Sequence, residues 1–596
     1  MALHSIDILI ILAYLLAVIF MGLWLRRRAG EGLTAYFLGG RNIPWYVLGV
    51  SNASSMFDIT GTMWLVSIMF VYGLKGTWLP WLWPTFNQIF LMIYLAVWIR
   101  RSGVVTGAEW IGTRFGNGRG AELSRLAIVV FALISVISFL IYAYQGVGRF
   151  AAAFLPWDWS PGTYAMILMG ITTFYVILGG MFSVVITDVF QFIMLTLASL
   201  FIAGIAMNQV APDALQAVIP AGWQELFFGW KLDLDWSGLI PAVGDKIAAD
   251  GYNLFTIVWM MLLFKGILTS MAGTAPNYDM QRVLATRNPR ESAFMSGMVS
   301  LALVPRWLLI AGITILGLVF YSGTLAGMEG GVDFEMLMPF VIREFIPVGL
   351  TGLIIAGLLA AYMSTFDSTV NAGAAYLVND IYKRYINPKA GEKRIIWMSY
   401  GASILIVVVG VVLGTQAESI HSAMGWIVTG LWGGFTIPNV LKWHWWRFNG
   451  YGYFWGMVAG ILTAMILAQL VPSAQYLYYF PVTMGMGALA SVVASLITDP
   501  DDQETLLAFY RSVRPWGFWG PIASKAQAED MNLMANVSAG RDLLNVAIGI
   551  VWQMTLVVAP IYLVIRQWTE LALAVILAVL TSILLKRNWF DRLEMD

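Results

Sequence analysis

Oxygen-bearing residues interrupt a strongly apolar segment, IIAGLLAAYMSTFDSTVNAGAAYLVNDIYKRY, at residues 354–385. Ala361, Ser364 and Thr365 are spaced i, i+3 and i+4, so on a helix their carbonyl and hydroxyl groups face the same way. Three neutral oxygens of this kind suit a hard cation such as Na⁺. The alternative is that both hydroxyls only hydrogen-bond to the carbonyl one turn back. Asp367 needs its own explanation, because an ionised carboxylate inside an apolar span requires compensation.

A second polar run, LGVSNASSMFDITGTMW at residues 48–64, interrupts another apolar segment at about mid-depth. A helix break there frees backbone carbonyls, and broken helices of this kind form ion and substrate sites in many membrane proteins. We expect Ser54 and Phe57 to supply the carbonyls, and Asp58 adds a charge. The alternative is an unbroken helix that packs its small residues against a neighbour, and no proline forces the break.

A third polar position is Asp188, in ILGGMFSVVITDVFQF at residues 177–192. The Gly179 and Gly180 pair predicts a turn at the membrane surface, which places Asp188 about two turns into the next span. Acids inside membrane spans usually serve a function. The alternative is a packing residue paired with a hydroxyl.

The elements that position these residues are membrane-spanning helices. The chain is 59% hydrophobic and only 11% charged, which is typical of a polytopic all-α membrane protein. Apolar runs that can cross a ~30 Å hydrocarbon core predict about fifteen helices. The runs lie at roughly 5–25, 43–72, 78–99, 124–150, 161–180, 182–207, 252–276, 293–321, 347–378, 395–414, 420–441, 452–471, 477–498, 542–566 and 569–585.

The charged residues indicate orientation and exclude some function classes. Lys plus Arg and Asp plus Glu balance at 34 each, so no nucleic-acid partner is indicated. Most of the basic residues fall on one side if the first helix crosses outside to inside, which predicts an outer N-terminus and a cytoplasmic C-terminus in the plasma (inner) membrane. The chain has no cysteine and three scattered histidines, so neither a metal triad nor a nucleophile pair is evident.

Six motifs in order carry a family resemblance. They are YFLGGRNIPWYVLGVSNASS, GVVTGAEWIGTRFG, LGGMFSVVITDVFQ, YDMQRVLATRNPRESA, AAYMSTFDSTVNAGAAYLVNDIYKRY and WWRFNGYGYFWG. The chain resembles the sodium/solute symporter family, which includes the sodium-glucose, proline and sialic acid cotransporters, over roughly residues 5–470. The resemblance implies a five-plus-five inverted repeat with extra helices at both ends. The expected parts are an N-terminal helix (1–42), two repeats (43–207 and 252–441) around an outer loop (208–251), further helices (442–498), a cytoplasmic loop (499–541) and C-terminal helices (542–596).

The resemblance also implies an ion site. The family's shared Na⁺ site would fall on the carbonyls of Ser54, Phe57 and Ala361 and the hydroxyls of Ser364 and Thr365. In members with a second Na⁺ site or a Na⁺ exit path, an acid matching Asp188 lies beside the hydroxyl pair. Asp367 stands where the glucose cotransporters have a hydroxyl residue, so it either supplies a second carboxylate or remains protonated.

The sugar-contacting residues of the glucose cotransporters are absent by motif spacing. The residues at those positions are Met56, Gly61, Pro80, about Leu303 and about Gly425. We expect the substrate contacts to come instead from Asp58, Thr60, Trp64, Trp78, Trp81, Gln145, Thr269, Ser270, Trp426 and Thr429. This set suits a polyol, a stacked ring or a cation held by aromatic faces, while packing and interfacial anchoring are the alternative for each tryptophan.

Two basic residues in the apolar runs, Lys265 and Arg306, need acidic partners. If Lys265 pairs with Asp58, the predicted substrate site is neutral, and no charge remains that would favour a cationic substrate.

Together these features predict a Na⁺-coupled symporter rather than an enzyme. Its partners are Na⁺, the lipid bilayer and a small organic solute, most simply a sugar, polyol or related polar metabolite, imported by alternating access. Alternatives are an importer of an amino acid, monocarboxylate or quaternary amine, or a membrane sensor on the same fold. A sensor would need a signalling domain, which the 499–541 loop is too short to supply.

Overall fold

The computed structural model describes residues 3–29, 33–82, 87–227, 232–250, 266–274, 278–326, 332–416, 432–470 and 480–593. Over these ranges the chain forms helices and connecting segments, with no β-strand. Within the described ranges, ten helices are long and apolar enough to cross a membrane. They confirm the polytopic all-α prediction. The count of about fifteen is not confirmed, and two expected spans, 252–276 and 420–441, lie largely outside the described residues.

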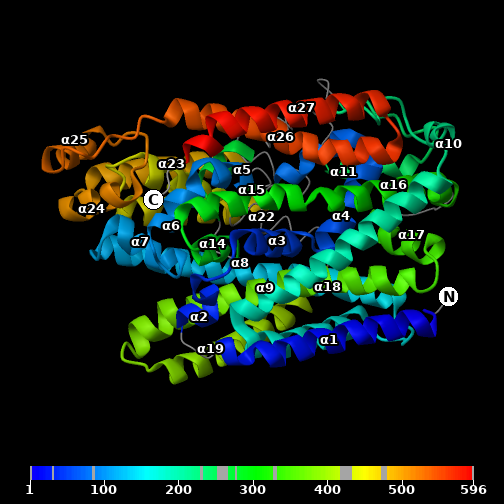
Figure 1. The fold of residues 1–596 in the computed structure, drawn as a ribbon, viewed down its shortest axis with the longest axis horizontal. Coiled ribbons are helices and arrows are strands. Elements are labelled where there is room, and N and C mark those ends of the chain that lie inside the picture. The colour runs from blue at the N-terminus through cyan, green and yellow to red at the C-terminus, as the bar shows by residue number, and fades with distance from the viewer. Residues whose placement is uncertain are drawn as a thin grey trace.

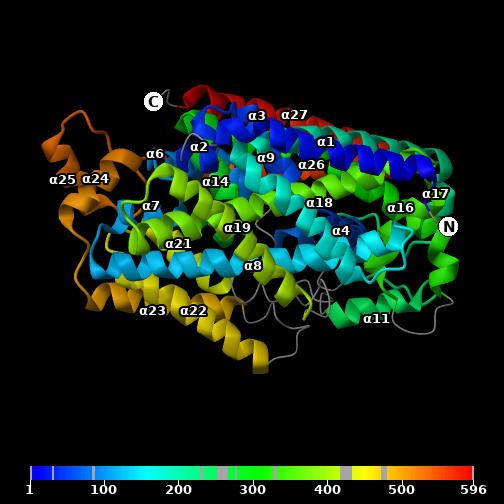
Figure 2. The same cartoon turned by 90° about the horizontal axis from the view of Figure 1, so that it is seen from below.

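The long helices lie side by side along one axis (Figures 1 and 2). The chain starts at the end of the bundle that carries α11 (Pro241–Asp250) and α17 (Leu337–Phe345). The opposite end carries α24 (Gln503–Val513) and α25 (Gly520–Glu529). The N-terminal end of the chain and the 499–541 loop therefore lie at opposite ends of the bundle.

The first part of the chain forms a series of short helices and two very long ones. Its helices are α1 (Ser5–Ala29), α2 (Leu33–Leu38), α3 (Trp45–Met56), α4 (Ile59–Tyr72), α5 (Asn87–Phe90), α6 (Ala96–Arg101), α7 (Gly107–Phe115), α8 (Arg119–Phe154) and α9 (Pro161–Gln209). A π-helical segment, Leu91–Leu95, joins α5 to α6.

The second part contains most of the remaining core. Its helices are α10 (Pro212–Gln216), α13 (Thr269–Met271), α14 (Tyr278–Ala285), α15 (Pro289–Ala302), α16 (Val304–Ala326), α18 (Leu350–Ala375), α19 (Glu392–Gly414) and α21 (Trp432–His444). They are followed by α22 (Gly450–Leu470), α23 (Phe480–Ile497), α26 (Ala539–Ile565) and α27 (Trp568–Asn588). α18 is buried along almost its whole length and packs against α1, α3, α8 and α9.

The predicted helix break is present between α3 and α4. Phe57 leaves the helical region with φ −88° and ψ 51°, and Asp58 is extended with φ −76° and ψ 156°. Asp58 begins the second half-helix as its N-cap, since its side chain accepts the Gly61 N–H at 2.8 Å. Aspartate is among the strongest N-cap residues, so this residue type fixes where α4 starts.

The turn expected at Gly179 and Gly180 does not interrupt the helix. α9 runs for 49 residues through both glycines, which is about 74 Å at ~1.5 Å per residue if the helix were straight. A single span needs only ~30 Å. α9 therefore takes in both of the spans expected at 161–180 and 182–207.

The 499–541 loop is held to the bundle by a buried arginine. Arg114, fully buried on α7, donates hydrogen bonds to the carbonyls of Lys442, Trp445 and Phe448 at 2.9–3.1 Å. It also lies 3.5 Å from Asp501. These carbonyls belong to the C-terminal end of α21 and the segment after it, and carbonyls there have no partner within the helix. Arg114 thus joins α7, α21 and the start of the loop.

Candidate functional site

The hydroxyl pair of α18 faces the last turn of α3. Thr365 donates Oγ1 to the carbonyl of Ser55 at 2.6 Å and to that of Ala361 at 3.2 Å. The Ser364 hydroxyl lies 3.0 Å from Oγ of Ser55. Ser364 and Ser55 are essentially inaccessible to solvent. These contacts join residues about 310 positions apart in the chain at a cluster of neutral oxygens.

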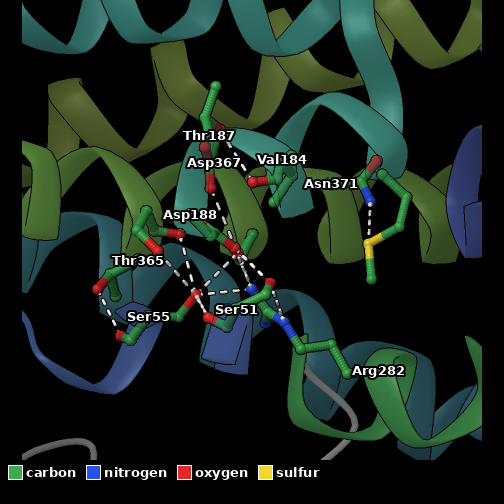
Figure 3. Close-up of polar contacts among 12 residues, drawn as sticks. Ser51, Ser55, Val184, Thr187, Asp188, Arg282, Thr365, Asp367 and Asn371 are labelled. Carbon is green, nitrogen blue, oxygen red and sulfur yellow. Dashed lines mark hydrogen bonds and ion pairs between the residues drawn. The ribbon is translucent and has the colours of Figure 1, made fainter. Parts of the chain in front are cut away.

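A buried ion pair lies beside these hydroxyls (Figure 3). Oδ2 of Asp188 on α9 is 3.0 Å from Nη2 of Arg282 on α14 and accepts the Ser51 hydroxyl at 2.5 Å. The guanidinium also donates to Ser51 at 3.0 Å, to Ser55 at 2.6 Å and to Ser368 at 2.7 Å. Asp188 is 0% and Arg282 1% exposed. Removing one partner of a pair buried this deeply typically costs about 3–5 kcal/mol.

A second carboxylate lies in the same cluster. Asp367, also fully buried, accepts the Ser368 hydroxyl at 3.2 Å. Ser55 bridges the two groups, because its hydroxyl lies 3.0 Å from that of Ser364 and accepts from Arg282, which pairs with Asp188. Two carboxylates, one guanidinium and several hydroxyls thus surround the point where α3, α9, α14 and α18 meet. A cluster with more acid than base among its described residues can accommodate a further cation.

A separate polar group forms at the break between α3 and α4. Asp58 lies 3.2 Å from Nη2 of Arg306 on α16 and accepts the Tyr142 hydroxyl from α8 at 2.9 Å. Arg306 also donates Nη1 to the Met56 carbonyl at 2.6 Å. The side chains of Asp58 and Arg306 are 15% and 12% exposed. Because acid and base are paired, this group carries no net charge.

A family model described as the sodium:solute symporter family matches residues 36–460. The chain belongs to this family. It is therefore a sodium-coupled membrane carrier of a small solute and not an enzyme.

Curated relatives of the symporter include proteins named as sodium/glucose and sodium/mannose cotransporters. Sodium/glucose cotransporter 4 of Danio rerio is 24% identical over 571 residues, covering 85% of this chain and 80% of the relative. Sodium/glucose cotransporter 2 of Rattus norvegicus is 26% identical, with 78% and 71% covered. A sodium/mannose cotransporter of Bos taurus is 25% identical, with 78% and 80% covered.

Among solved structures, the symporter is similar to a Na⁺-coupled sialic acid symporter in a substrate-bound, outward-open state. The TM-score is 0.66 at 17% identity, covering 84% of this chain and 99% of that one. At this identity the likeness shows that the two proteins share a fold.

The symporter brings Ala361, Ser364, Thr365, Asp188 and Asp367 of the predicted ion residues into one region. On α3 it is the Ser55 carbonyl that accepts the Thr365 hydroxyl, and the carbonyls of Ser54 and Phe57 stay predicted Na⁺ ligands. The Ser54 carbonyl accepts the Phe57 N–H at 3.1 Å in the last turn of α3. The ring of Phe57 lies against the Arg306 guanidinium, 5.7 Å from centroid to Cζ.

The predicted substrate residues are distributed over several places. Thr60 packs so closely on α8 that a Cβ added to Gly146 would lie 1.8 Å from its Oγ1. Gln145 donates to the Gly414 carbonyl at 3.0 Å. Thr269 lies 3.3 Å from the hydroxyl of Thr436, next to Ser270, which is buried.

Two tryptophans of the predicted substrate set, Trp64 and Trp78, have described side chains. Trp64 lines a cavity of about 340 Å³ together with Arg149, Lys246 and Glu335. Trp78 donates its indole N–H to the Leu226 carbonyl at 2.8 Å. The side chain of Trp81, as well as Trp426 and Thr429, lies outside the described residues.

The sequence analysis identified Arg306 as a basic residue in need of an acidic partner, but it gave no role to Arg282. Arg282 is buried in the ion cluster. Asp58 pairs with Arg306, and the expected alternative partner Lys265 lies outside the described residues. The number of acids inside apolar segments could have indicated these buried arginines, because each such acid needs a positively charged partner.

Proposed function

We propose that this symporter imports an uncharged, hydroxyl-rich solute, such as a sugar or polyol, together with Na⁺. The observation that carries the proposal is the paired charge at the helix break. Asp58 and Arg306, 3.2 Å apart, together offer acceptors and donors without net charge. Hydroxyl groups both donate and accept, so they can bond to each partner, whereas a solute with a net charge would leave one of the two uncompensated. The sugar carriers among the relatives support this solute class.

Na⁺ is assigned to the contact between α3 and α18. The proposed ligands are the carbonyls of Ser54, Phe57 and Ala361 and the hydroxyls of Ser364 and Thr365. The neighbouring Ser55 carbonyl, which accepts the Thr365 hydroxyl at 2.6 Å, is a further oxygen at this contact. Asp188 supplies the charge that attracts the ion, and with Asp367 it forms a second site or an exit path. In the conformation described, Arg282 donates to the same carboxylate, so Na⁺ and this guanidinium compete for Asp188.

The membrane orientation follows from the charge distribution. The end of the bundle that carries α24 and α25 is the cytoplasmic side of the plasma membrane, and the N-terminus is outside. The opposite ends at which the chain start and the 499–541 loop lie support this assignment (Figure 1). This proposed orientation is the one that the positive-inside rule predicts.

A ligand screen with a matched pair of variants tests the proposal. Thermal unfolding of the purified protein is followed with and without Na⁺ over sugars, polyols, amino acids, monocarboxylates and quaternary amines, because a ligand of the folded state stabilises it. We expect Na⁺-dependent stabilisation by a sugar or polyol. Ser364→Ala with Thr365→Ala should raise the Na⁺ concentration needed for half-maximal stabilisation at least tenfold, since two oxygen ligands are lost.

The control is Thr369→Ala on the same helix, whose hydroxyl bonds only to the Thr365 carbonyl at 2.7 Å. It should leave the Na⁺ dependence unchanged. Stabilisation only by charged solutes would contradict the solute class. An unchanged Na⁺ dependence in the double variant would contradict the ion site.

A further inference from the structure

A cavity of about 340 Å³ lies between α4, α8, α11 and the short helical turn Phe334–Met336. Its volume is just above the ~300 Å³ lower limit for small-molecule pockets. Two of its lining residues, Lys246 and Asp250, belong to α11, which lies at the end of the bundle where the chain starts (Figures 1 and 2). Trp64, a member of the predicted substrate set, also lines it.

The cavity lies in line with the polar group at the helix break. Asp58 begins α4 as its N-cap. Gly61, Trp64 and Ile68 follow at intervals of three or four residues, so they share one face of the helix. A Cβ added to Gly61 would lie 2.9 Å from Nη2 of Arg306, so this face meets the Asp58 group. Trp64 and Ile68 line the cavity further along the same face.

The helix α8 makes the same connection from its own side. Tyr142 donates its hydroxyl to Asp58 at 2.9 Å, and Arg149 lines the cavity. These two residues of α8 are two helical turns apart on one face, which is about 10 Å at ~1.5 Å per residue. α4 packs against α8. The two helices therefore lead from the Asp58 group to the cavity.

The charged side chains of the cavity wall lie at distances that leave room for a hydroxyl group between them. Nη1 of Arg149 is 3.6 Å from Oδ2 of Asp333 and 3.7 Å from Oε2 of Glu335. Both distances exceed the ~2.7–2.9 Å of a charge-assisted hydrogen bond, so a ligand hydroxyl can bond to acid and base at once. Lys246 and Asp250, 2.6 Å apart, add a donor and an acceptor to the same wall.

The rest of the wall is aromatic and apolar. The side chain of Trp64 surrounds the cavity together with Ile68, Val332 and Phe334. A sugar or polyol carries apolar C–H groups as well as hydroxyls. It can therefore pack its carbon skeleton against an indole ring while its hydroxyls bond to the charged side chains. Small-molecule sites commonly combine these two kinds of wall.

We propose that this cavity is an outer subsite for the transported solute, a hydroxyl-rich ring or polyol that binds there before it reaches the Asp58 site. The solute class rests on the function proposed above, whereas the location of the subsite rests on the cavity itself. The side chains of Arg149 and Asp333 are 27 and 51% exposed, against 12 and 15% for Arg306 and Asp58. Water competes more strongly at the more exposed position, so the outer subsite binds the solute more weakly than the Asp58 site does.

A single cysteine in the cavity wall tests this proposal, because the chain has no cysteine of its own. Val332→Cys places a thiol in the wall, at a partly buried residue. Ser237→Cys is the control, at an exposed residue shortly before α11. The full-length protein is labelled in Na⁺ with a water-soluble methanethiosulfonate, in increasing amounts of D-glucose, D-mannose or D-mannitol. Both variants are also combined with Asp58→Asn, which removes the inner solute contact proposed above.

We expect at least one of these solutes to slow the labelling of Val332→Cys and to leave that of Ser237→Cys unchanged. This protection should persist with Asp58→Asn, because the outer subsite does not contain Asp58. Trp64→Leu should raise the half-protecting concentration about threefold to tenfold, since packing against the aromatic ring is lost. Arg149→Gln, at a more exposed residue, serves if Trp64→Leu fails to fold.

Protection that disappears with Asp58→Asn would mean that binding at the Asp58 site closes the cavity, which would overturn the outer subsite and leave the proposed function standing. Equal protection of Ser237→Cys, an unchanged half-protecting concentration in Trp64→Leu or Arg149→Gln, or thermal stabilisation by a solute that gives no protection would overturn the subsite in the same way. If none of the three solutes protects Val332→Cys or stabilises the protein, the subsite and the proposed solute class both fail.

Discussion

The substitution Asp58→Asn separates the two roles of this residue. Asparagine is as good an N-cap as aspartate, so the start of α4 is retained through the Gly61 N–H. The negative charge 3.2 Å from Arg306 is lost. Because both side chains are largely buried, we expect a loss of about 3 kcal/mol of unfolding free energy, the lower end for a buried pair. Asp58→Ala should cost about 1 kcal/mol more, since it also removes the cap.

The assay follows thermal unfolding with Na⁺ alone and with Na⁺ plus the solute identified in the screen. Asp58→Asn should abolish the stabilisation by solute, whereas stabilisation by Na⁺ alone should largely survive, because the hydroxyls of Ser364 and Thr365 are untouched. Both unfolding and ligand response are measured in one experiment, so lost folding is distinguished from lost binding.

The double variant Asp58→Asn with Arg306→Met decides between solute contact and a purely structural ion pair. If the pair only orients α4 and α16, neutralising both partners should restore stability and solute binding together. If Asp58 bonds to the solute, stability should return in part and solute binding should not. Restored binding would refute the assignment of Asp58 to the solute.

Three further predictions concern other charged residues. Asp188→Asn should destabilise the protein by about 3–5 kcal/mol and reduce Na⁺-driven uptake. The double variant with Arg282→Gln should recover stability but not the coupling of uptake to Na⁺. Wild-type uptake and coupling in Asp188→Asn would show that the residue serves packing only. Burial raises the pKa of the Glu335 carboxyl from 4.5 to about 7, so the folded state holds this proton where the unfolded chain has lost it. Stability should therefore fall by up to about 3 kcal/mol as pH rises through that window; Glu335→Gln should flatten this slope, and an unchanged slope would contradict the prediction. Arg114→Met should lower thermal stability by several kcal/mol, because three carbonyls of the α21 end lose their donor, and a wild-type melting curve would exclude that role.

The helix break and the hydroxyl pair were predictable because their signals are local. A run of small polar residues ending in Asp58 contains both the break and the N-cap of the next helix. The spacing of Ser364 and Thr365 fixes which way their hydroxyls face. The hydrogen bond from Thr365 to the Ser55 carbonyl was not predictable in this way, because it depends on where the last turn of α3 ends and on how α3 packs against α18.

The buried arginines could not be predicted by the same means. Arg282 lies in a short amphipathic helix whose sequence is equally suited to the membrane surface, and charge counting places it there. Its contact with Asp188 joins residues 94 positions apart, and the contact of Arg306 with Asp58 spans 248. Such contacts are determined by the tertiary arrangement of the helices and leave no periodic signal in either segment.

Two backbone carbonyls at the end of α3 accept hydrogen bonds from the second half of the chain. The carbonyls of Ser55 and Met56 are held by Thr365 at 2.6 Å and by Arg306 at 2.6 Å. A neutral hydrogen bond contributes about 0.5–1.5 kcal/mol, and one to a charged group about 1.5–3 kcal/mol. Together the two bonds therefore stabilise this contact by a few kcal/mol. Any conformational change that separates α3 from α16 and α18 must break these two hydrogen bonds, so their strength contributes to the free-energy barrier between conformations. Thr365→Val should therefore make that conformational change faster and Na⁺ binding weaker. The rate of exchange between conformations would rise while the affinity for Na⁺ falls.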